Sequence, residues 1–86
     1  MNIDWYLLDE IERQHLIEHE ILGYQIDALS DFYVFQILKK FNTYQITKLY
    51  PLKYRTIVET NKNAAIADTL IDSVCLAALK SKGIVV

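Results

Sequence analysis

The chain has 86 residues, a hydrophobic share of 52%, a net charge of −2 and a single cysteine. This length allows one domain with a real core and excludes two, and one cysteine excludes an intrachain disulfide. There is no long uncharged apolar run and no basic start typical of a signal peptide, so we expect one domain, 1–86, in the cytoplasm and not in a membrane.

The charges are unevenly distributed along the chain. Residues 1–31 hold eight acidic and one basic side chain, a net charge of −7, whereas residues 39–62 hold six basic and one acidic side chain, a net charge of +5. This asymmetry predicts either an anionic partner for the middle segment or attraction between the two segments, within one chain or between subunits.

The first predicted element is a helix over residues 4–22, ended by Gly23. Its apolar side chains fall on more than one face, which is typical of a helix that is central or shared with a partner. We therefore expect a homodimer through this helix. The predicted interface residues are Trp5, Tyr6, Leu16, Ile17 and Ile21.

Two histidines in this helix have the spacing of a metal-binding pair. His15 and His19 lie four residues apart around Glu18, the H-x-x-E-H pattern of inverted zinc proteases. Because no third histidine exists and the chain is short for a substrate cleft, we expect a core His15 beside an exposed His19, with no metal and no cofactor. Adventitious metal binding is the alternative.

The middle of the chain predicts three short elements. Ser30 and Asp31 cap a helix over 31–41, a short helix follows over 44–50, and Pro51 separates it from residues 52–60. We expect 52–60 to be helical, although the β-branched run from Thr56 to Val58 is also typical of a strand.

The last predicted helix covers residues 64–81 and ends at Gly83. Its polar stripe is narrow, so we expect it to be the most buried helix. We expect the apolar tail, residues 84–86, to form a short strand or to bind in a groove. Together the elements predict an all-α fold, a compact bundle of four to five helices with a helix-turn-helix-like centre.

Residues 31–59 carry a resemblance to known proteins. A helix, a turn and then Thr43 to Ile57, with Thr47 where two helices would approach, resemble the helix-turn-helix class of DNA-binding proteins, although Pro51 stands where glycine is usual. The resemblance implies that Lys53, Tyr54 and Arg55 begin a recognition helix in the major groove. It places the predicted DNA-binding residues at Lys39, Lys40, Lys48, Lys53, Tyr54, Arg55 and Lys62.

The sequence thus supports two functions, neither enzymatic. The first is a small regulator that binds duplex DNA through residues 31–59. The second is a protein–protein interaction module, such as a small inhibitor, adaptor or antitoxin-like protein of a virus or mobile element, favoured by the six tyrosines and the many-sided first helix. A strand at 52–60 would favour the second function.

Overall fold

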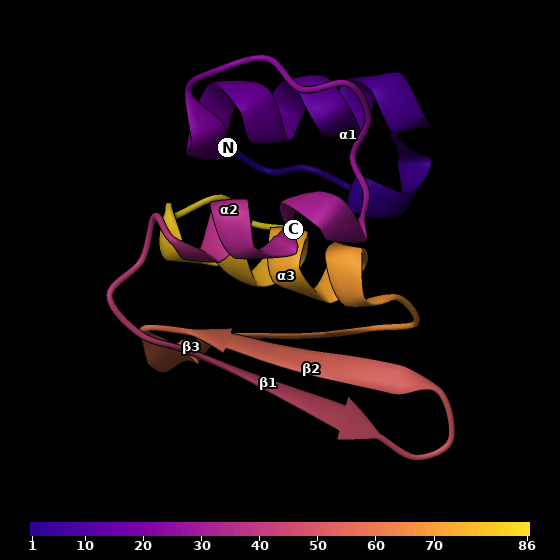
Figure 1. Ribbon diagram of the computed structural model, residues 1–86, viewed down its shortest axis with the longest axis vertical. Helices are drawn as coiled ribbons and strands as arrows, with labels where there is room; N and C mark the ends of the chain where they lie inside the picture. The colour runs from indigo at the N-terminus through magenta and orange to yellow at the C-terminus, as the bar shows by residue number, and fades with distance from the viewer.

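The computed structural model describes residues 1–86 and shows an α/β fold in three layers (Figure 1). The layer at one end contains α1, the middle layer contains α2 and α3, and a three-stranded sheet forms the other end. The elements are, in order, a 3₁₀ turn Trp5–Leu7, α1 Glu10–Ile17, a π-helical turn Glu18–Leu22, a 3₁₀ turn Asp31–Tyr33, α2 Val34–Leu38, β1 Tyr44–Leu49, β2 Lys53–Val58, β3 Thr60–Ala67 and α3 Leu70–Ser81.

The predicted all-α bundle of four to five helices is therefore wrong. The segments 44–50 and 52–60, expected to be helices, form the β1–β2 hairpin instead, so the helix-turn-helix-like centre does not exist. Their β-branched residues favour the extended backbone, where a branched side chain packs on a pleated surface. The alternative of a strand around Thr56 to Val58 is confirmed.

The two long helices differ from their predicted bounds. The helix expected over 4–22 is divided into a 3₁₀ turn, α1 and a π-helical turn, because Asp9 begins α1 with a capping box shared with Glu12. The helix expected over 64–81 begins only at Leu70, after the N-cap Thr69. Its end at Ser81, with Gly83 in the left-handed conformation, agrees with the prediction.

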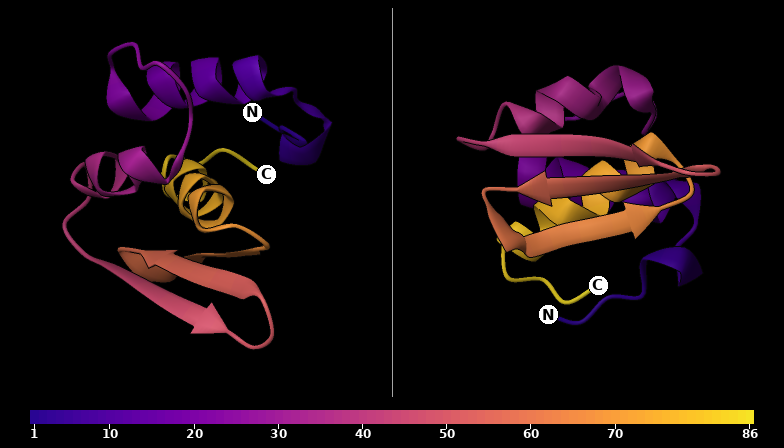
Figure 2. Two further views of the ribbon diagram at one scale, coloured as in Figure 1. Left: turned by 45° about the vertical axis from the view of Figure 1, so that its right-hand side comes forward. Right: turned by 90° about the horizontal axis from the view of Figure 1, so that it is seen from below.

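The sheet is antiparallel, in the order β1–β2–β3, and only one of its faces is covered by helices (Figures 1 and 2). Thr56 and Val58 of β2 and Ala65 and Ala67 of β3 are buried on the covered face. Small alanines let α3 lie close to the sheet. The predicted most buried helix is confirmed, since α3 carries an unbroken buried run from Ser73 to Leu79.

A buried polar pair joins the sheet to α3. Ser73 donates a hydrogen bond to the carbonyl of Leu70 at 2.9 Å, and its oxygen lies 2.8 Å from the Thr56 hydroxyl. With the Ser73 hydrogen so used, Thr56 is the donor of the second bond. Both hydroxyls are thereby satisfied inside an otherwise apolar core.

The first layer is tied to α3 through Trp5. The Trp5 indole Nε1 donates to Asp72 at 3.0 Å, and the Arg13 Nε donates to the Trp5 carbonyl at 2.9 Å. The Arg13 guanidinium also lies 5.4 Å from the Trp5 ring centroid, a cation–π distance. These contacts fix the start of the chain against the beginning of α3.

The apolar C-terminal tail does not join the sheet. Val85 forms an isolated parallel bridge with Asn2, and Ile84 is buried in the core. The two chain ends therefore lie side by side, as Figure 2 shows.

Candidate functional site

The face of the sheet that points away from the helices is the candidate site. Strand register assigns eight side chains to it, since residues paired across antiparallel strands share a face. We call this surface the outer sheet face. It consists of Gln45, Thr47, Leu49, Lys53, Arg55, Ile57, Ala64 and Ile66.

No element of the chain covers this face (Figure 2). Its side chains nevertheless pack on one another in rows across the strands. One row joins Thr47, Arg55 and Ile66, and a second joins Gln45, Ile57 and Ala64. Ile66, in the first row, lies on the edge strand β3 and is 53% exposed. This row therefore presents apolar surface to solvent.

Arg55 is the one charged residue in the middle of the outer sheet face. It is partly buried between its cross-strand neighbours, and its Nε is shielded from solvent without a hydrogen-bond partner in the chain. The shielded Nε is out of reach of a partner, so a carboxylate of another protein would accept its two hydrogen bonds from the terminal N–H groups of the guanidinium.

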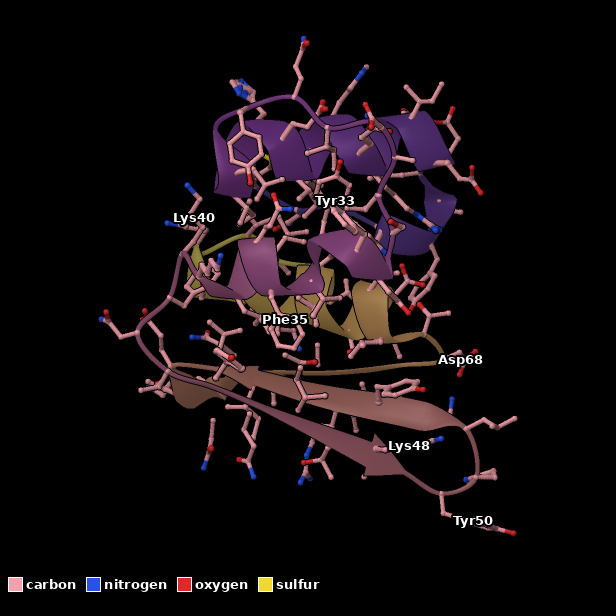
Figure 3. The ribbon with its side chains drawn as sticks, viewed as in Figure 1. Tyr33, Phe35, Lys40, Lys48, Tyr50 and Asp68 are labelled. Atoms are coloured by element: carbon pink, nitrogen blue, oxygen red, sulfur yellow. The ribbon has the colours of Figure 1, made fainter.

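The end of the sheet beside the β1–β2 turn is also apolar. Tyr50 is 97% exposed at the tip of the hairpin (Figure 3), and Leu52 next to it is largely exposed. Beyond the turn, Lys53 forms an exposed ion pair with Asp68 at 2.7 Å, and this bond raises the pKa of Lys53. The pair reduces the positive charge that Lys53 offers to a partner.

The structure does not bring the seven predicted DNA-binding residues onto one surface. Lys53 and Arg55 lie on the outer sheet face, whereas Lys48 and Tyr54 are paired with each other on the opposite face. Lys39 and Lys40 follow α2, where the Lys40 Nζ lies 5.7 Å from the centroid of the Tyr24 ring. Lys62 lies in an irregular part of β3, beside the shift in register at Val58.

The residues predicted for a homodimer interface are mostly internal. Trp5, Ile17 and Ile21 belong to the core of the chain, and Leu16 is partly buried against it. Tyr6 is exposed. Of these five residues, a partner that approached α1 would therefore reach only Tyr6 and part of Leu16.

Both histidines of the predicted metal-binding pair are exposed, so the expectation of a core His15 is wrong. The face of α1 that carries His15 and Ile11 points to solvent, because α1 packs through Ile17 and the residues that follow it. The structure contains no group of three or more His, Cys, Asp or Glu side chains that could hold a metal ion.

Sequence reasoning missed the outer sheet face because helical spacing was assumed for residues 44–57. A sequence signal for a strand was present in the β-branched run from Thr56 to Val58, but it does not say which side chains share a face.

No helix in the structure combines the length and the apolar character needed to cross a membrane. The chain matches no family model, no curated protein and no solved structure.

Proposed function

We propose that this protein is a non-enzymatic interaction module that binds an acidic surface of another protein with its outer sheet face. The observation that carries the proposal is an uncovered sheet face on which the exposed Ile66 lies beside Arg55, whose Nε has no hydrogen-bond partner in the chain. Arginine is enriched at protein interfaces, and the buried centre of an interface is more apolar than the rest of the surface.

Charge supports an acidic partner. The acidic residues 1–31 lie mainly in the α1 layer and its connections, at the end of the molecule opposite the sheet (Figure 1). The sheet end is therefore the more basic end, and an acidic protein would approach it in preference to the α1 layer. We place the protein in the cytoplasm, where the unpaired, buried Cys75 suits a reducing environment.

Two exposed isoleucines of similar accessibility allow a matched test. A photo-crosslinking amino acid is placed at Ile66 on the outer sheet face or at Ile11 on α1, which are 53% and 64% exposed. In the native cell, Ile66 should give a discrete covalent adduct with another protein and Ile11 should give none. Arg55→Glu should abolish the adduct while leaving the far-ultraviolet circular dichroism unchanged. Equal labelling from both positions, or an adduct that survives Arg55→Glu, would contradict the proposal.

Duplex DNA is a second candidate ligand, favoured by the +5 charge of residues 39–62. A β-ribbon can enter the major groove, so the loss of the recognition helix does not by itself remove this function. Fluorescence anisotropy with duplex DNA at low salt tests it. Binding that weakens with added salt and with Arg55→Ala would support DNA, whereas no binding at micromolar protein would remove it.

A further inference from the structure

His15 and His19 lie side by side on the surface of the α1 layer. His15 is in the last turn of α1, and His19 follows it in the π-helical turn. Side chains four residues apart on a helix are neighbours, and both imidazoles line the same two surface hollows, each with a volume of about 380 Å³. A buried His15 could not bind an ion from solvent, and the exposure of both side chains removes that obstacle.

Neither imidazole is held by another group of the chain. The carboxylate of Glu18, which lies between the histidines in the sequence, instead accepts a hydrogen bond from the Ile26 N–H at 2.7 Å and one from the Gln14 side-chain amide at 3.3 Å. The one ion pair of the chain, Lys53 with Asp68, lies beyond the β1–β2 turn. Both imidazoles are therefore free to bind a transition-metal ion, for which imidazole is a preferred ligand.

The chain supplies only half of a zinc site at this place. A structural zinc ion takes four ligands in a tetrahedron and leaves no position open. No group of three or more His, Cys, Asp or Glu side chains is placed to hold a metal ion within one chain. Two of the four ligands must therefore come from another molecule.

We propose that His15 and His19 bind a zinc ion together with the same two histidines of a second copy of this chain. A two-fold axis through the ion relates the copies, so that four imidazoles surround the metal. The α1 layer forms one end of the molecule, opposite the sheet (Figure 1). The copies meet at this end, and both sheets stay remote from the contact.

The charge around the histidines makes this contact depend on the metal. Glu18 lines one of the two hollows, Glu12 and Glu20 line the other, and residues 1–31 together carry a net charge of −7. Two such acidic surfaces repel each other at close approach, and a bound dication offsets part of that repulsion. The metal is thus the link between the copies. The inference is independent of the partner that the outer sheet face binds.

Sedimentation of the purified, chelator-treated protein tests the site. The chain should be a monomer without metal and a dimer after zinc is added, with one zinc ion for two chains. Mg²⁺ at the same concentration should leave the monomer, because Mg²⁺ prefers oxygen ligands. A dimer without metal, a dimer formed equally well with Mg²⁺, or zinc bound to a chain that stays monomeric would overturn the proposal.

Variants of the two histidines test which side chains bind the ion. His15→Ala and His19→Ala should each abolish the zinc-dependent dimer and leave the far-ultraviolet circular dichroism unchanged, because both residues are exposed. Ile11→Ala is the matched control, since it shortens an exposed side chain one turn earlier on α1 and removes no ligand, so its dimer should remain. A dimer that survives either histidine variant would contradict the proposal.

Cobalt provides a spectroscopic test of the coordination. Co²⁺ in place of zinc should form the same dimer and show the strong visible absorption of a tetrahedral ion. The weak absorption of an octahedral, hydrated Co²⁺ in the presence of the protein would rule out four imidazoles on one ion.

Discussion

At the scale of single residues, removing both hydroxyls of the pair between β2 and α3 should cost less stability than the sum of the two single removals. Ser73→Ala leaves the buried Thr56 hydroxyl without its 2.8 Å partner, whereas Thr56→Val leaves Ser73 bonded to Leu70. We expect Ser73→Ala to lower the free energy of unfolding by about 1–3 kcal/mol and Thr56→Val by about 1 kcal/mol. Urea unfolding followed by circular dichroism measures both.

The double variant Thr56→Val/Ser73→Ala completes this cycle. Replacing both partners removes the unsatisfied hydroxyl, so its loss of stability should be smaller than the sum of the two single losses. Strictly additive losses would show that the hydroxyls do not act together.

Glu18 should make the protein sensitive to acid. Its carboxylate accepts a 2.7 Å hydrogen bond from the Ile26 N–H, and this bond, helped by Gln14 and His15, holds the pKa of Glu18 below its ordinary value. The stabilisation is complete above the pKa that Glu18 has when unfolded, and it is lost as the pH falls through the lower folded value.

Glu18→Gln should therefore lower the urea midpoint at neutral pH and have less effect in acid, where the parent has lost the same contribution. Glu20→Gln is the matched control, because it removes the same charge from the same π-helical turn without breaking a hydrogen bond. Equal shifts for the two variants would assign the effect to net charge.

At the scale of elements, the sequence predicted where helices end more accurately than whether a segment is a helix or a strand. The stops at Gly23 and Gly83 were visible because both glycines take a positive φ of 80°, which glycine adopts without strain. The hairpin was missed because Ile46 and Leu49 also have helical spacing, so a short apolar pattern fitted both periods. The strand forms because β1 pairs with β2, and the pattern within 44–49 alone does not show this pairing.

The boundary at residues 64–69 shows the same limit. Ala64 to Ala67 have high helix propensity and predicted an early start to the last helix, yet they form the end of β3. Ala65 and Ala67 are buried there because α3 needs small residues beneath it. The residues of the outer sheet face could not be predicted for the same reason, because which side chains share that face depends on the pairing of three strands. Arg55 was predicted to bind DNA from a recognition helix, and that helix does not form because Arg55 lies in β2.

The end of the π-helical turn gives a prediction at this scale. Gly23 has φ +80°, and a Cβ added there would meet no atom within 4 Å. The cost of Gly23→Ala is therefore backbone strain alone, about 1–2 kcal/mol, and Gly23→Asn should cost less because asparagine tolerates the left-handed conformation better. Thermal unfolding of both variants measures the two losses of stability. Equal costs would mean that the turn relaxes out of this conformation.

At the scale of the whole molecule, the three layers should unfold together. Trp5 in the first layer contacts Asp72 of α3, and the buried run of α3 contacts the sheet, so α3 belongs to the packing of both outer layers. A layer that detached alone would expose part of α3 and lose these shared contacts. The fold is therefore expected to be one cooperative unit, in line with the single domain expected over 1–86.

Two natural probes in different parts of the fold test this cooperativity. Trp5 is the only tryptophan, and Cys75 is the only cysteine, fully buried in α3. Burial, with Asp72 nearby, raises the pKa of the Cys75 thiol well above its ordinary value, so the reactive thiolate is disfavoured in the native protein. Labelling of Cys75 by a thiol reagent should be negligible without urea and should rise with the same urea midpoint as the change in Trp5 fluorescence. A Trp5 transition at lower urea than Cys75 labelling would show instead that the α1 layer detaches first, leaving α3 on the sheet as the stable core.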